Sequence, residues 1–456
     1  MVTLYQASPR KTLFLLISMI VIFCFYYSSV NISSNLFLIT NSIIIGFCII
    51  SLVVRSETPF SLYAMFFLFS LFFYGLVPAL EVTNSISYWG GEVISVSSYV
   101  YTNFIVIICF ILFQIVYALS YGKKDIACKD VIKYNFTMKK TKSRYQVLSF
   151  MLLLGISIGG FTLWYNNFNL SSLFFRGGEL TDRVVLQGPS WLLYHYFLKP
   201  IPAVCALVYA LAYGIKSRGA WLLLILTFVI SSPTSMARFQ AAVIYIPLFL
   251  VFFKALRREF YFPSVLVFGL LFIFPLLDKF RTFSSNDGFG YNLDYSFLLS
   301  GHFDSYQNFI RVFDLEMISY GWQLLGAILF FVPRSIWPNK PVGSGYNLAQ
   351  DLNLSLSNIS LNYLGEGYIN FGILGVLLFL AILGIFCGWF DRKFWKKNIN
   401  AGVNISNIFY MFSLGLVFFL MRGDLMSSFA YSMGMLFSVM LVVKIFNKLD
   451  STNYKF

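Results

Sequence analysis

The chain has 456 residues, of which 58% are hydrophobic and 20% aromatic, whereas only 11% are charged. A soluble globular protein carries about 25% charged residues, so the composition excludes that class and indicates a membrane protein. The net charge of +14 at pH 7 is explained by membrane orientation, as the loops show, and does not indicate nucleic-acid binding.

Apolar runs of about 20 residues, long enough to cross roughly 30 Å of hydrocarbon, recur along the chain and predict an all-α, polytopic protein. The first run follows Arg10 and Lys11, and no small-residue cleavage site comes after it, so we expect an uncleaved span. Twelve transmembrane helices are expected, at residues 12–30, 36–54, 60–80, 100–121, 147–165, 191–214, 219–232, 239–254, 260–277, 368–390, 405–421 and 425–446.

The basic residues alternate between the loops as the positive-inside rule requires. With the amino terminus in the cytoplasm, most of the 33 Lys and Arg fall in cytoplasmic segments. We therefore expect a multi-pass protein of a bacterial inner membrane with both termini cytoplasmic. Nine cations remain on the outer side, and Lys199 lies inside a span; the nine are Arg176, Arg183, Arg238, Lys279, Arg281, Arg311, Arg334, Lys340 and Arg422.

One outer segment is much longer than the others and divides the chain into three parts. These are residues 1–277 with nine spans, a large periplasmic loop at 278–367, and residues 368–456 with three spans. Apolar residues at helical spacing predict an amphipathic helix that lies on the membrane face and ends at Gly321. They are Phe303, Tyr306, Ile310, Phe313 and Met317. Residues 322–332 are apolar but too few to span, so we expect a re-entrant or interfacial helix.

Outer cations are candidates for binding an anionic substrate such as a diphosphate, because the planar fork of arginine suits bidentate phosphate contacts. The alternative is pairing with neighbouring carboxylates, as between Arg422 and Asp424. The candidate diphosphate-binding residues are Arg238, Arg281, Arg334 and Lys340, followed by Arg176, Arg311 and Lys199.

Two of these candidates sit beside helix ends or breaks. Arg238 closes the hydroxyl-rich turn 231–238 at the start of a helix, where free N–H groups favour an anion. The alternative there is simple N-capping by Ser235. Lys199 lies one helical turn after His195 and just before Pro200, which with Pro202 should kink the helix. An ionisable residue inside a span indicates function, although Lys199 can instead snorkel to the outer interface.

The outer acid–base candidates are Asp278, His302, Asp304 and Glu366. Glu366 ranks first as a catalytic base, because its flanking glycines let backbone or substrate approach closely, and Asp304 ranks second. The sequence contains no paired-carboxylate, H-E-x-x-H or nucleotide-binding glycine motif in the outer loops. We therefore expect neither a metal nor another cofactor.

Three stretches share a pattern with a known family. They are Phe303-Asp304, the run F-V-P-R-S-I-W-P-N-K-P at 331–341, and the run G-E-G-Y-I-N-F-G at 365–372. With the turn before Arg238, they resemble the Wzy-type O-antigen polymerases. The resemblance implies a GT-C-like membrane glycosyltransferase that joins undecaprenyl-diphosphate-linked oligosaccharide repeat units at the periplasmic face. It also implies a chain-length regulator as partner, and the enzyme would work among membrane lipids. We expect metal-independent transfer, because Arg and Lys can neutralise the leaving diphosphate.

Two other classes remain open at this stage. A lipid-linked oligosaccharide flippase or other transporter also has about twelve spans, but the long outer loop disfavours it. An O-antigen ligase has a similar topology and joins the finished polymer to the lipid A core. The sequence leaves the sugars, the linkage and the oligomeric state open.

Overall fold

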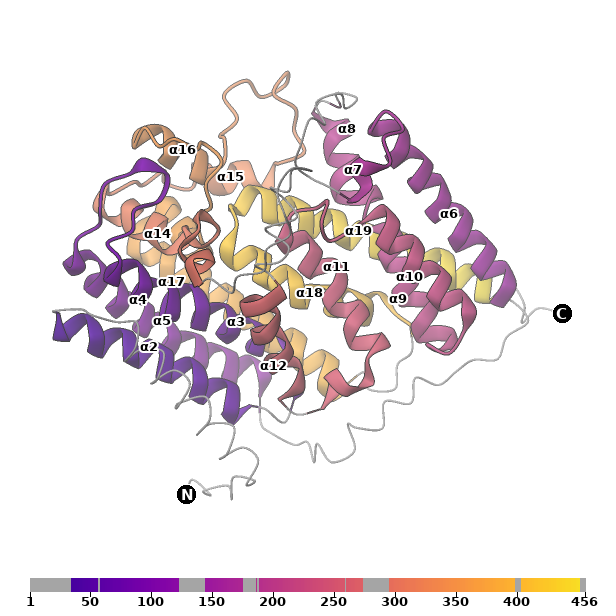
Figure 1. Cartoon of the computed structure of the whole chain (residues 1–456), viewed down its shortest axis with the longest axis horizontal. Helices are drawn as coiled ribbons and strands as arrows, with labels where there is room; N and C mark the ends of the chain where they lie inside the picture. Colours follow the sequence, from indigo (N-terminus) through magenta and orange to yellow (C-terminus); the bar gives the residue numbers. More distant parts are fainter. Residues whose placement is uncertain are drawn as a thin grey trace.

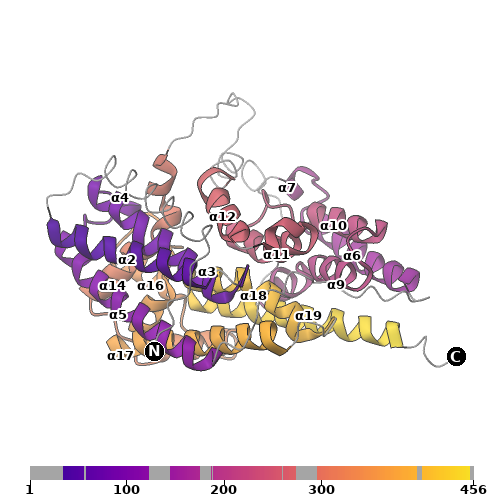
Figure 2. The same ribbon diagram turned by 90° about the horizontal axis from the view of Figure 1, so that it is seen from below.

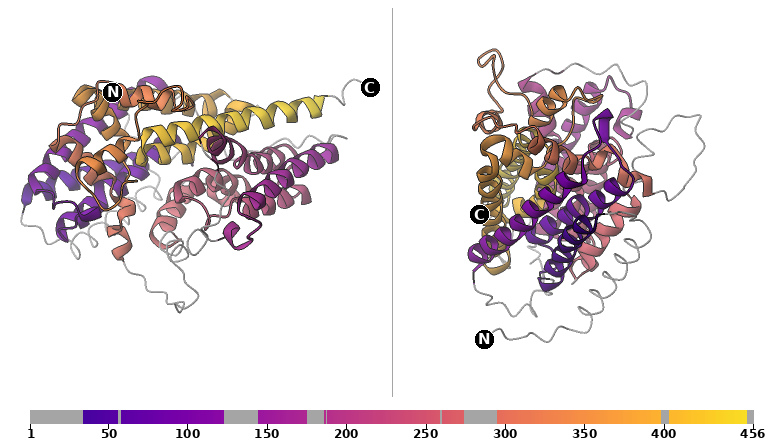
Figure 3. Two further views of the ribbon diagram at one scale, coloured as in Figure 1. Left: turned by 90° about the horizontal axis from the view of Figure 1, so that it is seen from above. Right: turned by 90° about the vertical axis from the view of Figure 1, so that its left-hand side faces the viewer.

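The computed structural model describes residues 34–55, 58–122, 144–174, 186, 188–258, 260–273, 295–397 and 403–451. Over these ranges the protein is helical and contains no strand, as the apolar periodicity predicts. Figures 1, 2 and 3 show long helices packed against one another, with shorter helices between and beside them.

The helices follow the predicted spans closely. The α-helices are α2 (Asn35–Val54), α3 (Leu62–Ser70), α4 (Val77–Thr83), α5 (Val96–Tyr121), α6 (Arg144–Tyr165), α7 (Ser171–Phe174), α8 (Pro189–Leu192), α9 (Ile201–Tyr213), α10 (Arg218–Ile230), α11 (Arg238–Phe252), α12 (Tyr261–Phe268), α14 (Ser305–Asp314), α15 (Trp322–Ile328), α16 (Ser344–Asp351), α17 (Tyr363–Arg392), α18 (Ile405–Arg422) and α19 (Leu425–Ser451). Single π-helical turns join α3 to α4 (η1, Leu71–Leu76), follow α8 (η4, Leu193–Leu198) and extend α12 (η6, Gly269–Ile273).

Eight helical stretches of the described residues are long and apolar enough to cross a membrane. They are Asn35–Val54, Leu62–Thr83, Val96–Tyr121, Arg144–Tyr165, Pro189–Tyr213, Tyr363–Trp395, Ile405–Arg422 and Leu425–Asp450. Shorter apolar helices stand at three more predicted positions, Arg218–Ile230, Arg238–Phe252 and Tyr261–Phe272. The first predicted span, 12–30, lies outside the described residues, and the count of twelve stays a prediction.

The predicted break near Pro200 is present. After α8 the chain makes the π-helical turn η4, and residues 199–200 form a turn before α9 begins at Ile201. Pro200 and Pro202 have no N–H for a helical hydrogen bond, which explains why the regular helix is interrupted here.

Small residues let the long helices approach closely. A side chain at Gly388 of α17 would place its Cβ 2.7 Å from the carbonyl oxygen of Tyr117 on α5. A Cβ at Gly415 of α18 would meet the backbone of α11 at Val243. Helix pairs in membranes associate through such small-residue contacts, because the lipid offers no hydrophobic driving force between them.

Asp391 ties together several helices at one end of the bundle. Its fully buried carboxylate accepts hydrogen bonds from the backbone N–H groups of Leu62 (3.0 Å) and Tyr63 (3.2 Å) at the start of α3. It also accepts the hydroxyl groups of Tyr117 (2.9 Å) and Tyr410 (2.6 Å). The positive-inside rule places the four donor residues on the same side of the membrane, and in the structure they meet at Asp391.

The predicted amphipathic helix exists as α14, but its predicted place on the membrane face is wrong. Every side chain from Ser305 to Phe313 is buried, because α14 packs against α5, α16, α17 and η1. The polar side chains Gln307, Asn308 and Arg311 donate hydrogen bonds to the loop after α4 and to the segment before α17. The helix ends at Asp314, and Gly321, with φ of 87°, instead precedes the short helix α15.

Candidate functional site

The turn between α18 and α19, residues 422–426, is the centre of the candidate site. It contacts the start of α14, the start of α17 and the loop that follows α15. These three segments carry the predicted residues Asp304, Glu366 and Lys340. Figure 1 shows α14, α15, α16 and the start of α19 near one another at one end of the bundle.

Asp304 is a buried carboxylate with a complete set of partners. It lies directly before α14 and is 1% exposed. One oxygen accepts the indole N–H of Trp89 at 2.8 Å, and the other accepts the Ser360 hydroxyl. The guanidinium of Arg422 lies 3.8 Å from the same carboxylate. The Asp304 carboxylate therefore contacts Trp89, Ser360 and Arg422, which come from three separate segments of the chain.

Arg422 connects three helices around this carboxylate. It ends α18, donates from Nε to the carbonyl oxygen of His302 at 3.1 Å, and lies over the Phe239 ring of α11 at 4.7 Å. The expectation that Arg422 pairs with its neighbour Asp424 is therefore replaced by the pair with Asp304. Sequence reasoning did not place Arg422 among the anion-binding candidates. Its position at the end of an apolar span was the signal that marks a functional cation.

Trp89 reaches Asp304 because its loop adopts an unusual backbone. Its φ is 62°, in the left-handed region, and its carbonyl oxygen is held by the Ser355 N–H at 2.9 Å. The indole lies so close to Gly301 that any side chain there would collide with it. His302, half-buried in the turn beside Gly301, contributes its carbonyl oxygen to Arg422.

Glu366 lies in the first turn of α17 and is 1% exposed. One carboxylate oxygen accepts the Ser344 hydroxyl of α16 at 2.8 Å, and the other accepts the Leu425 N–H of α19 at 3.0 Å. The Glu366 carboxyl group therefore joins the starts of three helices, α16, α17 and α19. Its role as base stays a prediction, since an acceptor would have to reach a buried group.

Of the two glycines that flank Glu366, Gly367 allows close backbone approach, one of the two uses expected for them, whereas a Cβ at Gly365 would meet the Leu361 side chain. α17 bends back sharply at Phe371 and Gly372, where Gly372 has φ of 63°. A Cβ at Gly367 would consequently lie 2.7 Å from the Gly375 carbonyl oxygen across the bend. The first arm of α17 also holds α15 in place, because the Asn370 side chain accepts the Leu324 N–H at 2.7 Å.

Asp424 is a second acid at the start of α19. It accepts the N–H groups of Met426 at 2.9 Å and Ser427 at 3.2 Å, so it caps the helix. Burial raises the pKa of Asp424 above its ordinary value of 3.8, because water no longer solvates the charged form. Glu366 and Asp424 therefore crowd two carboxyl groups around one helix end.

Arg334 and Lys340 fold their own loop. The Arg334 fork donates to the carbonyl oxygens of Lys340 (2.7 Å) and Pro341 (3.3 Å). The Lys340 ammonium donates to the carbonyl oxygens of Phe330 (2.5 Å) and Val332 (3.1 Å). Partial burial and then the charge of Arg334 lower the pKa of Lys340. The structure thus brings these two predicted cations together in one loop, which we call the Arg334–Lys340 loop (residues 330–341).

The remaining cation candidates are dispersed. Arg238 is the first residue of α11, directly before Phe239, and is half-buried. The N-cap there is Ala237 without a side-chain hydrogen bond, so the predicted capping by Ser235 is wrong; the Ser235 hydroxyl donates to the Ser232 carbonyl oxygen.

Arg311 and Lys199 lie in different surroundings. Arg311 is buried in α14 and donates to Asn308, to the Ser87 hydroxyl and to the Tyr88 carbonyl oxygen. Lys199 lies at the break before α9, and its carbonyl oxygen accepts the Ser231 hydroxyl at 3.4 Å. Arg176, Arg281 and Asp278 lie outside the described residues.

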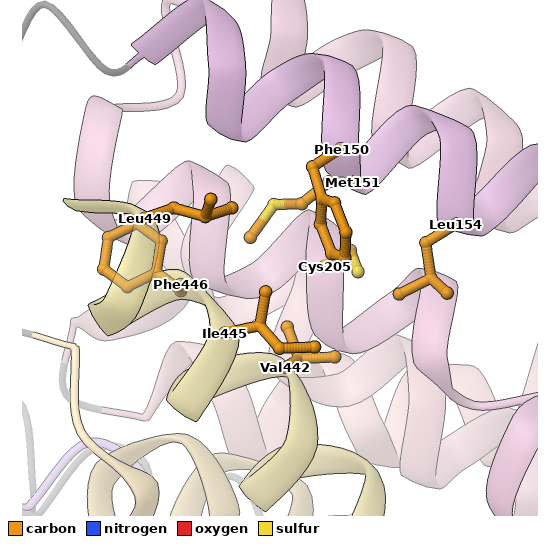
Figure 4. A pocket seen from close by; sticks show the side chains of 8 residues that line it. All are labelled: Phe150, Met151, Leu154, Cys205, Val442, Ile445, Phe446 and Leu449. Carbon is orange, nitrogen blue, oxygen red and sulfur yellow. The ribbon is translucent and has the colours of Figure 1, made fainter. Parts of the chain in front are cut away.

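Two hollows lie beside α19. The smaller, of about 10 Å³, has only apolar neighbours from α6, α9 and α19 and has room for about one water molecule (Figure 4). The larger, of about 630 Å³, lies between α8–η4 and α19. Within the described ranges, no group of three or more His, Cys, Asp or Glu side chains is arranged to hold a metal ion.

The fold and this cluster define a multi-pass helical membrane protein with buried charged groups at one end of its bundle. Residues 308–450 match the family described as O-antigen polysaccharide polymerase Wzy, which confirms the resemblance predicted from the sequence. The match includes Arg334, Lys340, Glu366 and Arg422, whereas Asp304 lies just before it. A search of curated proteins and a search of solved structures each gave no match.

Proposed function

We propose that this chain is an O-antigen polymerase that joins undecaprenyl-diphosphate-linked oligosaccharide repeat units at the periplasmic face of the inner membrane. The match of residues 308–450 to the Wzy family carries the proposal, because it supports polymerase-type glycosyl transfer at the family level. Eight apolar helices support a multi-pass protein suited to lipid-linked substrates. In the proposed orientation both termini are cytoplasmic and the α18–α19 turn faces the periplasm.

The proposed reaction transfers the growing chain to an incoming unit. The bond between the anomeric carbon and the lipid diphosphate breaks, and a new bond forms to a hydroxyl oxygen of the acceptor sugar. The hydroxyl proton passes to a protein carboxylate, and the diphosphate leaves with its bonding electron pair. Positively charged side chains stabilise that leaving group without a metal, as fixed cations in a low-dielectric site do.

The proposed base is Glu366, with Asp304 and then His302 as the other candidates. Both carboxylates lie against the α18–α19 turn, within one cluster of contacts. Each is buried, so the acceptor hydroxyl must displace a present partner, such as the Ser344 hydroxyl at Glu366. A base must come within about 3 Å of the hydroxyl that it deprotonates. A glycan-induced opening of this end of the bundle is therefore part of the proposal.

The cations proposed to bind the diphosphate begin with Arg334 and Lys340, whose loop adjoins the α18–α19 turn. Arg334 and Lys340 share one loop, and Arg238 precedes Phe239, whose ring Arg422 covers. These residues are proposed to neutralise the lipid diphosphate, together with Arg281, Arg176, Arg311 and Lys199. A chain-length regulator is the proposed protein partner.

The function is tested by the lipopolysaccharide pattern of a strain that lacks the encoding gene. A polymerase deficiency leaves lipid A core carrying one repeat unit, and the wild-type chain restores the ladder of long polymers. Bare core without any repeat unit would instead indicate a ligase, and loss of all surface repeat units would indicate a flippase. Either of these two results would overturn the proposed function.

A further inference from the structure

An apolar groove of about 630 Å³ lies between α19 and α8–η4. Along α19 it is lined by residues spaced about one helical turn apart, from Ala430 through Gly434, Phe437 and Leu441 to Lys444. These positions cover about 21 Å of helix at 1.5 Å per residue, or roughly two thirds of the hydrocarbon thickness. The groove therefore follows the direction of a lipid chain beside a transmembrane helix.

Close contacts between α19 and η4 form the floor of the groove. α19 and η4 meet at Gly434, where a side chain would collide with the Tyr196 carbonyl oxygen. The Ser438 hydroxyl of α19 donates to the Phe197 carbonyl oxygen of η4 at 2.6 Å. The walls remain open to the surroundings, since Leu193 and Phe437 are each 54% exposed.

Positive charge lies near both ends of the groove: Lys444 lines one end, and the Arg334–Lys340 loop contributes to the other. Phe330 and Phe331 line it there, and the Phe330 ring lies 6.3 Å from the Phe429 ring near the start of α19. The Lys340 ammonium lies 2.5 Å from the carbonyl oxygen of Phe330, so the Arg334–Lys340 loop forms this end. Figure 1 shows α8 and α15 in the same upper part of the molecule. This end of the apolar groove is thus formed by a residue whose carbonyl oxygen the Lys340 ammonium contacts, and Arg334 belongs to the same loop.

We propose that this groove holds the polyisoprenoid tail of the lipid-diphosphate substrate, with the diphosphate against Lys340 and Arg334. The inference rests on the proposed function and adds a place and an orientation for the carrier lipid. The tail lies along α19 between Phe331 and Leu441, and the diphosphate stands at the Phe330 end, next to the α18–α19 turn.

Charge and shape favour this occupant over an ordinary phospholipid. A phospholipid presents a single phosphate and two chains, whereas a polyisoprenyl diphosphate presents two linked phosphates and one branched chain. Two adjacent cations match the diphosphate, because each charge-assisted contact strengthens the binding. The aromatic lining, Tyr196, Phe197, Phe330, Phe331 and Phe437, offers broad apolar surfaces to methyl-branched units.

The test locates the bound lipid in the purified full-length protein in nanodiscs. A photoactivatable phenylalanine analogue replaces Phe437 or Leu441 in the groove, and Leu153 on α6, an apolar residue that is 67% exposed, serves as the control position. The probe is radiolabelled undecaprenyl diphosphate. We expect crosslinks at both groove positions, removed by unlabelled undecaprenyl diphosphate and not by an equal excess of phosphatidylglycerol. Equal crosslinking at Leu153, or competition by phosphatidylglycerol, would overturn the assignment.

A second arm tests the orientation and separates this inference from the proposed function. Lys340→Gln combined with Arg334→Gln should weaken undecaprenyl diphosphate binding roughly tenfold, because two charge-assisted contacts are lost, while undecaprenol binding is unchanged. An equal loss for both lipids would contradict the proposed orientation. The filling variant Leu193→Trp with Phe437→Trp should shorten the polymer ladder, and Leu153→Trp should not. A normal ladder in the filling variant would contradict lipid binding in the groove but would leave the proposed polymerase function unaffected.

Discussion

Arg422 at the end of α18 lies 3.8 Å from the Asp304 carboxylate at the start of α14, and Asp304 is 1% exposed. The pair joins two segments that lie far apart in the sequence. Removing one partner of a buried ion pair strands the other charge, whereas replacing both with apolar residues is often tolerated. Variants of this pair can therefore distinguish a role of Asp304 in stability from a role in the reaction.

Arg422→Met should destabilise the folded protein by about 3–5 kcal/mol, because Asp304 loses its cation in a buried site. The double variant Arg422→Met, Asp304→Asn should regain most of that stability, because the neutral amide keeps an oxygen for the Trp89 N–H and can donate to the Ser360 hydroxyl. Thermal unfolding in detergent measures both. If the double variant unfolds normally and still makes long polymers, neither residue takes part in the reaction. If it folds and makes none, the pair is functional.

Glu366→Gln should stop polymer formation while the protein still folds and binds carrier-linked substrate. The amide keeps an oxygen for the Leu425 N–H and can donate to the Ser344 hydroxyl, so the local packing survives. Loss of a general base lowers the rate by about 100-fold or more. The assay uses the purified variant and lipid-linked repeat units.

Ser344→Ala, which removes only one hydrogen bond to the same carboxylate, is the matched control and should retain most activity. Near-normal synthesis by Glu366→Gln would make the glutamate structural and Asp304 the stronger base candidate.

Asp391→Ala should lower stability without a specific effect on the reaction. Four donors, from Leu62, Tyr63, Tyr117 and Tyr410, would lose their acceptor in a fully buried place. An unsatisfied buried donor costs about 1–3 kcal/mol, so a loss of several kcal/mol is expected. Thermal unfolding and the yield of folded protein report the effect. Asp351→Ala, at an exposed position of α16, should change neither quantity. A fully stable Asp391→Ala protein would show that water replaces the carboxylate.

Asp424 should make the protein more stable as the pH falls. Burial raises its pKa above 3.8 in the folded state, so the folded protein binds a proton more readily than the unfolded chain. This contribution to the free energy of unfolding is fully present below the pKa of the unfolded chain. It is lost as the pH rises through the raised pKa of the folded protein. Asp424→Asn keeps an oxygen for the Met426 N–H and should remove this part of the pH dependence. Unfolding temperatures of both proteins between neutral and mildly acidic pH provide the comparison. Parallel curves for the two proteins would contradict the assignment.

The amino-acid sequence by itself determined the helical membrane class and the positions of most long helices. Runs of apolar residues carry that information locally, because any segment of sufficient length and hydrophobicity gains from leaving water. The break at Pro200 and the inability of residues 322–332 to span were also readable, since proline chemistry and segment length are local properties. The family resemblance could also be recognised from the sequence, because short contiguous motifs carry it.

Only the tertiary structure decided which polar residues meet. α14 has the periodicity of a surface helix, yet its polar side is buried because distant loops supply partners for Gln307, Asn308 and Arg311. Arg422 pairs with Asp304 instead of its sequence neighbour Asp424, because the bend at Gly372 and the α18–α19 turn set which helix ends come together. Spacing along the chain reports which face of a helix a side chain occupies, whereas its partner depends on packing between helices far apart in sequence.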